Sequence, residues 1–389
     1  TTENRWLLPE GIDELLPERA GQLEALRRRL LDQCARWGYR YVIPPLVEFT
    51  DSLLVGLGAD LDLVTCKFTD QMSGRMLGVR ADITPQAARM DAHSLAETGV
   101  TRLCYAGSTL QSSPQSAISG RAPIQLGAEL FGSDTVEADG EIITLMLSLF
   151  QSCDVTRELT LDIGHIGIYD ALFSDAGLDP DLEAEIFDAL QRKSMPDIDR
   201  LAASLPAEAA TKLLALAELH GSVSVVAEAR GVFANEPVVL EALGELESTL
   251  TLVQSDFPDV GVYVDLTELR GFRYHTGLVF AVYLEGRGSA VAKGGRYDNI
   301  GAVFGRDRPA TGFAIDLKAL IDDAAPAEPA LPPVIAPVSD DPVLRDAVAT
   351  LRASGRTVVV DLESGATALD GQRLVLQDGE WIIEGESGS

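Results

Sequence analysis

Cysteine and histidine are scarce in this sequence and stand far apart. The chain has four cysteines and four histidines among 389 residues, with no C-x-x-C pair and no H-E-x-x-H motif. A disulfide framework or a structural metal site needs such ligands at close, regular spacing. We therefore expect four reduced thiols, no bound metal and a cytoplasmic protein.

Long hydrophobic runs are also missing. No apolar run approaches the roughly 18 to 20 residues that span a bilayer. The first residues, TTENRWLLPEG, lack the basic flank and apolar segment of a secretory signal. The hydrophobic content is nevertheless 46%, and 389 residues leave room for two or three domains with a sizeable core. These features predict a globular protein without membrane contact.

Basic residues are few compared with acidic ones. The chain carries 60 Asp and Glu against 31 Lys and Arg, a formal net charge of −29. Nucleic-acid binding depends on basic side chains that displace counterions from phosphates, so this charge predicts no nucleic-acid partner. The alternative is that the acidity serves solubility alone, in which case it does not exclude a nucleic-acid partner. One basic triplet, Arg27-Arg28-Arg29, falls on a predicted helix as a solvated face.

The first half of the chain alternates helix and strand signals. Apolar spacings of three and four predict a helix over 17–38, begun by Pro17 and ended by Gly38. Thr84 is expected to be the N-cap of a later helix. The other elements expected here are a strand at 39–43, a hairpin at 67–70 and 75–80, a helix at 86–97, strands at 103–107 and 124–131, a helix at 139–153 and a strand at 159–164.

The second half begins with a helical block and returns to strands. Residues 170–258 show helical spacing throughout, and strands follow at 260–266, 274–284, 289–293 and 311–315. The Ala/Pro-rich segment 323–333 predicts a linker. We expect an α+β protein: an antiparallel sheet flanked by helices in a domain of residues 1–322, with the helical insertion, and a small α/β module at 334–389.

The stretch from Leu103 to Gly132 carries the first family signal. It reads LCYAGSTLQSSPQSAISGRAPIQLGAELFG, a strand, a polar loop and a returning strand. This pattern resembles motif 2 of class II aminoacyl-tRNA synthetases, and the histidyl-tRNA synthetase version above all. In that family the loop begins Phe-Arg-x-Glu, and its arginine binds the α-phosphate of ATP. Here the same positions read Leu110, Gln111, Ser112 and Ser113.

Four polar residues match an amino-acid pocket. A free amino acid carries an ammonium group, which carboxylates and amide oxygens bind well in a shielded place. Asp82, Thr84, Gln125 and Glu129 supply such groups, and the matching positions in histidyl-tRNA synthetases hold the α-amino group. The alternative is that Glu129 is an exposed strand residue and Thr84 only a cap.

Two further segments resemble histidine-specific signatures of the same family. ELRGFRYHTG at 268–277 is similar to L-V-R-G-L-D-Y-Y. The resemblance assigns Arg270 to the substrate carboxylate and Tyr274 to the first tyrosine. His275 replaces the second tyrosine, which contacts the imidazole, and Arg273 replaces the aspartate. AKGGRYDN at 292–299 is similar to A-G-G-R-Y-D-x-L, whose glycines let the backbone pass close to a ligand.

A fourth segment resembles motif 3. Residues 309–320 read PATGFAIDLKAL, whereas the family ends this motif in Gly-x-Glu-Arg, with the arginine on the γ-phosphate of ATP. The corresponding positions are Asp316, Lys318 and Ala319. Loss of both ATP arginines removes the charges that adenylation needs, because such chemistry depends on positioned charges. We therefore expect no synthetase activity.

Taken together, the chain is similar to the regulatory subunits of ATP phosphoribosyltransferase, a synthetase paralogue family in histidine biosynthesis. The resemblance covers residues 5 to about 320, including GYRYVIPPLVEFTDSLL, GVRADITPQAARMDAH and QLGAELFG. It implies a non-catalytic subunit without a cofactor, which forms a hetero-oligomer with a short catalytic subunit, activates it and enables inhibition by histidine. It also implies a self-dimer through residues 17–45, which resemble motif 1. The histidine-binding residues it implies are Asp82, Thr84, Gln125, Glu129, Arg270, Tyr274 and His275. A histidyl-tRNA synthetase-like amino-acid ligase and a free-standing histidine sensor stay open as alternatives.

Overall fold

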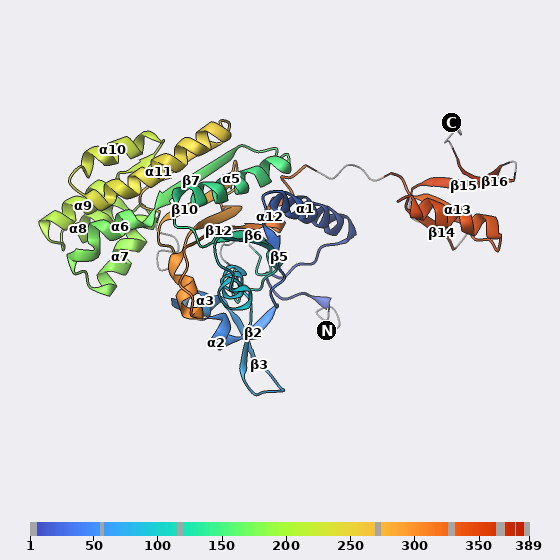
Figure 1. Cartoon of the computed structure of the whole chain (residues 1–389), viewed down its shortest axis with the longest axis horizontal. Helices are drawn as coiled ribbons and strands as arrows, with labels where there is room; N and C mark the ends of the chain where they lie inside the picture. The colour runs from blue at the N-terminus through green and yellow to red at the C-terminus, as the bar shows by residue number, and fades with distance from the viewer. Residues whose placement is uncertain are drawn as a thin grey trace. The chain divides into compact units, whose positions relative to one another are not determined.

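A computed structural model describes residues 6–54, 58–114, 120–268, 274–325, 331–362, 370–377 and 379–384. The chain divides into two compact units, Thr1–Ala325 and Pro326–Ser389 (Figure 1). The predicted domain limits and the linker at 323–333 stay predictions, because 326–330 lie outside the described residues. Within the described ranges, no helix is long and apolar enough to cross a membrane.

A nine-stranded sheet forms the centre of the large unit. Neighbouring strands are antiparallel except for β1 with β5 and β7 with β9, which run parallel. The strands lie in the order β1 (Arg40–Tyr41), β5 (Thr101–Ser108), β6 (Ile124–Phe131), β12 (Ala310–Asp316), β11 (Ala292–Arg296), β10 (Leu278–Leu284), β7 (Leu159–His165), β9 (Gly261–Asp265) and β8 (His220–Gly221). The predicted antiparallel sheet is therefore confirmed.

Helices cover one face of this sheet and build the main core. α1 (Pro17–Arg36) buries Leu23, Leu26, Leu30 and Cys34, which are the apolar positions that predicted it, and Gly38 ends it with a φ of +83°. α5 (Val136–Ser152) packs beside it and against β6 and β12, and α11 (Pro237–Asp256) packs beside α5 and against β7 (Figure 1). Side chains alternate along a strand, so the opposite face of β6 is left for other partners.

A smaller apolar cluster lies on that opposite face. α4 (Thr84–Arg89) and a 3₁₀ helix, η4 (Asp298–Phe304), pack there. The buried members of the cluster are Ile83, Ala87, Ala88, Leu103, Tyr105, Phe131, Tyr297, Ile300 and Ala310. The helix predicted at 86–97 begins earlier, at Thr84, and continues from Met90 to Leu95 as a π-helix, η2. Asp91 of this π-helix forms a buried ion pair with Arg308.

A small antiparallel sheet accompanies this cluster. Its strands lie in the order β2 (Val47–Phe49), β4 (Met76–Val79) and β3 (Cys66–Thr69), joined to the short helices α2 (Thr50–Leu53) and α3 (Gly58–Val64). The predicted hairpin is therefore present. The strand predicted at 39–43 is shorter than expected: only Arg40 and Tyr41 pair, because the chain turns away at Pro44-Pro45, which cannot donate to a ladder.

The predicted helical insertion is present. It contains α6 (Ile166–Phe173), α7 (Pro180–Gln191), α8 (Met195–Ala202), α9 (Ala207–Ala217), α10 (Ser224–Val232) and α11, with a 3₁₀ turn, η3 (Ser174–Ala176). Figure 1 shows these helices gathered beside β7 and β10. The sequence pattern did not predict α6, α8 or α10, because each is only eight or nine residues long and offers little periodicity.

The small unit is the predicted α/β module. Its sheet has the order β14 (Val358–Asp361), β13 (Val334–Pro337), β15 (Gln372–Gln377) and β16 (Glu380–Ile383), and α13 (Pro342–Ala353) packs on it. Asp341 accepts a hydrogen bond from the Val343 N–H at 2.9 Å, which caps α13, and another from Trp381 Nε1 at 2.8 Å. This aspartate therefore ties the helix to the last hairpin.

Candidate functional site

The four residues predicted to bind an ammonium group come together on the face of the sheet that lies away from the main core. On β6, Leu126, Ala128 and Leu130 enter the main core. Gln125 and Glu129 therefore point to the other face, because side chains alternate along a strand. Asp82 and Thr84 lie just before and at the start of α4, which packs against β6. Strand alternation and the docking of α4 thus assemble the site.

Asp82 and Gln125 form one half of the site. Gln125 Nε2 donates a hydrogen bond to Asp82 Oδ1 at 2.7 Å, and its Oε1 accepts one from the Ile83 N–H at 2.8 Å. The Thr84 N–H also donates to Asp82 Oδ1, at 3.0 Å. These bonds all leave Asp82 Oδ2 available for another donor. Asp82 is thereby held in one orientation although it is one methylene shorter than the family's glutamate.

Glu129 forms the other half and is completely buried, with 0% exposure. Tyr105 Oη donates to Glu129 Oε1 at 2.8 Å, and Tyr297 Oη donates to Oε2. The Thr84 hydroxyl lies 3.0 Å from the Tyr105 hydroxyl. The alternative of an exposed Glu129 is therefore wrong. The expectation that Thr84 caps the helix is also wrong, since the cap position is Ile83 and the Thr84 side chain bonds to a tyrosine.

Burial raises the pKa of the Glu129 carboxyl to about 8, although hydrogen bonds from Tyr297, Tyr105 and Thr84 act in the opposite direction. The nearby charge of Asp82 raises this pKa further. In the described part of the chain, no lysine, arginine or histidine forms an ion pair with Glu129. At neutral pH this carboxyl is therefore mostly protonated.

Tyr274, in the segment before β10, lies close enough to Asp82 and Glu129 to feel both charges, and His275 follows it in sequence. The Tyr274 ring stacks on that of Tyr297, with centroids 5.1 Å apart. Its buried hydroxyl has no hydrogen-bond partner among the described residues, and burial, with Asp82 and Glu129, raises its pKa well above the usual range. An unpaired buried hydroxyl costs free energy, so this group favours a polar ligand.

His275 sits beside Tyr274, edge-on to its ring. Its Nδ1 donates to the Arg296 carbonyl oxygen at 3.2 Å. Burial lowers the pKa of His275 to about 4, so the ring is neutral at physiological pH and Nε2 is an acceptor. The tyrosine that this position carries in the synthetases is thus replaced by a neutral acceptor. Arg270 and Arg273 lie outside the described residues.

Glycines leave room for these side chains. A Cβ atom on Gly312 of β12 would lie 1.7 Å from Glu129 Oε2, and one on Gly295 of β11 would lie 2.8 Å from His275 Nδ1. The backbone at Gly295 therefore passes close to His275, whereas the predicted close passage of residues 292–299 to a ligand stays a prediction. Sequence reasoning missed Gly312, Tyr105 and Tyr297. Tyr105 lies two residues after Leu103 on β5 and so on the same face, whereas Cys104 between them enters the main core. This alternation is the signal that could have placed Tyr105 on this face.

Neither position that should carry an ATP arginine offers a guanidinium. Gln111 is 6% exposed and its N–H bonds to the Arg121 carbonyl at 2.8 Å. Asp316 caps α12 (Leu317–Leu320) by accepting from the Lys318 N–H at 3.0 Å, and the Ala319 side chain packs against the main core. The Lys318 ammonium is paired with Asp13. Both arginines that bind the phosphates of ATP in the synthetases are therefore absent.

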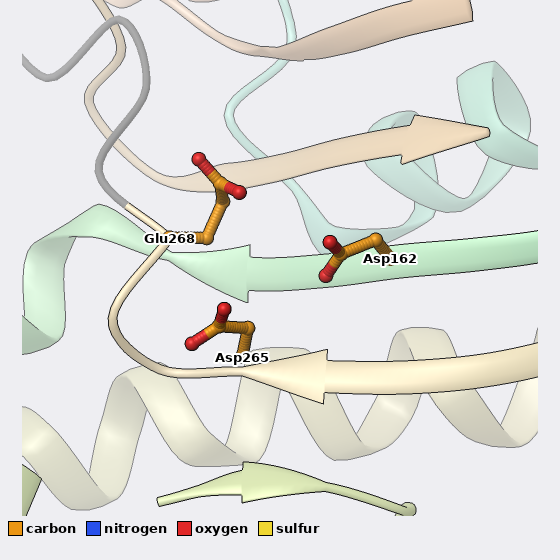
Figure 2. Close-up of side chains that lie close together, drawn as sticks. All are labelled: Asp162, Asp265 and Glu268. Carbon is orange, nitrogen blue, oxygen red and sulfur yellow. The ribbon is translucent and has the colours of Figure 1, made fainter. Parts of the chain in front are cut away.

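Three carboxylates form a separate cluster, one in the middle of β7, one at the end of β9 and one just after β9. Figure 2 shows Asp162, Asp265 and Glu268 pointing toward one another, and their ligand atoms lie within 4.8 Å of one another. Lys193 Nζ donates to Asp265 Oδ2 at 2.7 Å, and Thr267 donates twice to Oδ1. Both oxygens of Asp265 therefore already have partners within the chain. The predicted absence of a metal stays a prediction.

Comparisons with known proteins agree with this arrangement. A family model described as histidyl-tRNA synthetase matches residues 11–320, and a model of the C-terminal domain of the ATP phosphoribosyltransferase subunit HisZ matches residues 332–384. An ATP phosphoribosyltransferase regulatory subunit from Marinobacter nauticus is 47% identical, with 99% of each chain covered. One from Thioalkalivibrio sulfidiphilus is 49% identical, covering 98% of this chain and 99% of the relative. The chain belongs to the family of ATP phosphoribosyltransferase regulatory subunits.

Solved structures support the family assignment and the fold. A Bacillus halodurans protein described as an ATP phosphoribosyltransferase regulatory subunit/histidyl-tRNA synthetase superposes with a TM-score of 0.82 at 27% identity, covering 93% of this chain and 94% of that one. A histidyl-tRNA synthetase from Nostoc sp. superposes with a TM-score of 0.77 at 17% identity, covering 97% and 96%. The second likeness concerns the fold alone.

The first prediction concerns Gly312. Gly312→Ala places a methyl group inside the Glu129 carboxylate, so either Glu129 or β12 must shift. We expect a loss of about 1–3 kcal/mol or more in the free energy of unfolding, measured by urea denaturation. Gly288→Ala is the matched control, because a Cβ there meets nothing within 4 Å. Equal stability of the two variants would contradict the described packing of Glu129.

The second prediction concerns the pH dependence of stability. The pKa of Glu129 is about 8 in the folded chain and 4.5 ordinarily. Between these values the unfolded chain loses a proton that the folded chain keeps, so this group's contribution to stability falls as pH rises and becomes constant above about 8. Glu129→Gln removes the effect. The unfolding free energy of the variant should therefore rise relative to the original chain between pH 5 and 8, by a few kcal/mol at about 1.4 kcal/mol per pH unit.

The control for this measurement is Glu208→Gln on α9, where the glutamate side chain is 82% exposed. Its pH profile should run parallel to that of the original chain. A Glu129→Gln profile that also runs parallel would mean that Glu129 is ionised in the folded protein at neutral pH.

Proposed function

We propose that this chain is a non-catalytic, cytoplasmic regulatory subunit of ATP phosphoribosyltransferase. It binds a short catalytic subunit, raises its activity at the first step of histidine biosynthesis, and makes it responsive to histidine. The family membership supports the regulatory role. The observation that carries the histidine-binding part is the buried carboxyl of Glu129, which is fixed by two tyrosines but has no cation paired with it in the described residues.

The chemistry of this site suits an amino acid. An ammonium group can replace the proton on Glu129 and also reach Asp82, whose Oδ2 is left available by Gln125 and Thr84. For the ligand's side chain, the Tyr274 hydroxyl can donate or accept a hydrogen bond, and His275 Nε2 can accept one. An imidazole has both a donor and an acceptor nitrogen, so histidine fits this set. Arg270 is proposed for the carboxylate because it matches the family motif.

The proposed absence of ligase activity follows from the two ATP positions. Adenylation builds charge on a phosphate, and that charge must be met by positioned cations. Gln111 and Ala319 stand where the synthetases carry arginines, and neither has a charge. The amino-acid site is therefore proposed to sense histidine and not to activate it.

The proposed self-dimer uses the unit formed by α1 and β1. β1 is an edge strand of the nine-stranded sheet, with β5 on one side only. Tyr41 in this strand is 43% exposed, and Ile43 and Leu46 after it are 75% and 51% exposed. Exposed edges and exposed apolar side chains are features that proteins usually cover. A second copy of this chain is the proposed cover. The net charge of −29 supports a protein partner and no nucleic acid.

The third prediction concerns regulation by histidine. Adding this chain to the short catalytic subunit should raise its rate, and histidine should lower the rate of the complex. Glu129→Gln should leave the activation in place and raise the histidine concentration for half-inhibition by at least about tenfold, because the ammonium loses its carboxylate. Initial-rate assays of the complex measure both quantities, with Glu208→Gln, the same substitution at an exposed position, as the control.

Different failures of this assay have different meanings. No activation by the unaltered chain would reject the regulatory role. Normal activation with unchanged histidine inhibition in Glu129→Gln would place histidine elsewhere. Robust histidine-dependent ATP–pyrophosphate exchange by the chain alone would favour the ligase alternative, and histidine binding without any effect on the catalytic subunit would favour the free-standing sensor.

The fourth prediction is that histidine binding releases a proton. The groups that face Glu129 are Asp82, Tyr105, Tyr274 and Tyr297, and none of them supplies a positive charge. Below pH 8 the ligand ammonium must therefore displace the proton of Glu129, and the affinity for histidine should rise between pH 6.5 and 8. Calorimetry in buffers of different ionisation enthalpy should detect the released proton, and Glu129→Gln should abolish this release. Equal heats in all buffers would contradict it.

A further inference from the structure

Lys193 occupies a backbone position that favours glycine. It follows α7 with a φ of +50°, and the Ser194 N–H donates to the Ala189 carbonyl at 3.0 Å, a bond typical of helices that end in the left-handed conformation. A residue other than glycine is strained in this conformation. The strain points to a role for the lysine side chain itself.

The Lys193 side chain joins the helical insertion to the end of β9. Its Nζ donates to Asp265 Oδ2 at 2.7 Å. The same ammonium lies 5.8 Å from the ring centroid of Tyr263, which is two residues earlier in β9 and therefore on the same face. Asp265 is only 5% exposed, and a buried carboxylate needs a nearby cation. Lys193 supplies that charge.

Asp265 fixes the turn of residues 265–268, here named the β9 turn. Its Oδ1 accepts from the Thr267 N–H at 3.0 Å and from the Thr267 hydroxyl at 2.6 Å, and its carbonyl accepts from the Glu268 N–H at 3.2 Å. Figure 2 shows Asp265 at the end of β9 and Glu268 in the turn that follows, both close to Asp162. Carboxylates this close repel one another, so a cation on Asp265 stabilises the β9 turn.

One row of paired residues crosses five strands of the large sheet and ends at the proposed ligand site. Residues that pair directly have their side chains on the same face of a sheet. In order, from β7 through β10, β11 and β12 to β6, the members of the row are Gly164, Val279, Gly295, Gly312 and Glu129. The ligand site therefore extends along a floor in which three of five positions are glycines.

Side chains from other segments cover the three glycines. His275 lies over the glycine of β11, and Glu129 over that of β12, as described above. The glycine of β7, Gly164, is covered by the β9 turn, since a Cβ atom on it would lie 3.1 Å from Glu268 Cβ. Burial lowers the pKa of His275, and the charge of Glu268 acts against this shift. The β9 turn thus stands at one end of the row, beside His275, and Glu129 stands at the other.

We infer that Lys193 is a positioning residue of the proposed histidine site: its ion pair with Asp265 holds the β9 turn, and with it Glu268, at the end of the row beside His275. This inference rests on the proposed histidine binding. The ammonium half of that site, Glu129 and Asp82, is held by other residues, so Lys193 acts on the remainder of the ligand. It also gives the helical insertion a link to the site, through which a change at either one alters the other.

The fifth prediction concerns histidine affinity, measured by calorimetry with the full chain. Lys193→Gly removes the ammonium and also the backbone strain, so the variant should fold normally and yet bind histidine at least about fivefold more weakly. Lys193→Arg keeps a cation for Asp265 and should restore most of the affinity. The proton that Glu129 is expected to release per bound histidine should be the same in both variants, because the ammonium half of the site is intact.

The control is Arg192→Met, one residue earlier, because the ion pairs of Arg192 with Asp188 and Asp197 stay within the helical insertion. Its histidine affinity should equal that of the unaltered chain. Thermal melts check the fold of each variant, and Lys193→Met takes the place of Lys193→Gly if glycine lowers the melting temperature.

Several results would overturn the inference. Lys193→Gly could bind histidine as tightly as the unaltered chain, Arg192→Met could weaken binding equally, or Lys193→Arg could fail to restore it. Loss of the proton release together with the affinity would mean that Lys193 only stabilises the whole site. If Glu129→Gln weakens histidine binding and the Lys193 variants do not, this inference alone fails. If the unaltered chain binds no histidine, the proposed histidine site fails as well.

Discussion

The burial of a carboxyl group in the middle of the sheet is the constraint on which the site depends. Glu129 lies on β6, and its two oxygens accept from Tyr105 on β5 and from Tyr297 after β11. Gly312 on β12 leaves the space. A buried carboxyl without these donors would carry a large desolvation penalty, so the three surrounding segments must keep their register. The same contacts that stabilise the centre of the sheet therefore shape the ligand site.

Much of this arrangement follows from patterns that can be read along the chain. The limits of β6, its pairing with β5 and the amphipathic α1 were predictable because alternation and helical spacing are strong in those segments. Alternation also places Gln125 and Glu129 on one face. The partners of Glu129 were not predictable, since a tyrosine hydroxyl can reach a carboxylate from any neighbouring strand and the register across β11 and β12 appears only in three dimensions. For the same reason Thr84 resembled a cap, and only its contact with Tyr105 shows its place in the site.

This chain differs from the synthetases more at the ATP-binding positions than at the amino-acid-binding positions. Where the family binds an amino acid, this chain keeps a carboxylate at Asp82 and at Glu129 and changes a tyrosine to His275. Where it binds ATP, both arginines are gone and a lysine that remains is paired with Asp13. Short helices such as α8 were not singled out, because eight residues give too few turns for their spacing to stand out within a block that is helical throughout. The residues at the amino-acid and ATP positions could be compared with the family from sequence alone. The contact between residues 9–14 and Arg121 could not be predicted, because it joins segments more than 100 positions apart.

If histidine binds as proposed, its ammonium group takes the place that a proton on Glu129 occupies in the free protein, and this exchange would give the site a way to act on the rest of the molecule. With the proton present, Glu129 is neutral and its bonds to Tyr105 and Tyr297 are ordinary ones. With a cation bound, Glu129 is charged and both tyrosine bonds become stronger. Tyr105 contacts Thr84 at the start of α4, and Tyr297 stacks on Tyr274. Binding can therefore bias the positions of α4 and of the segment before β10. A partner that contacts either element with different affinity in the two states would sense the ligand, and this differential affinity is the one physical requirement for regulation.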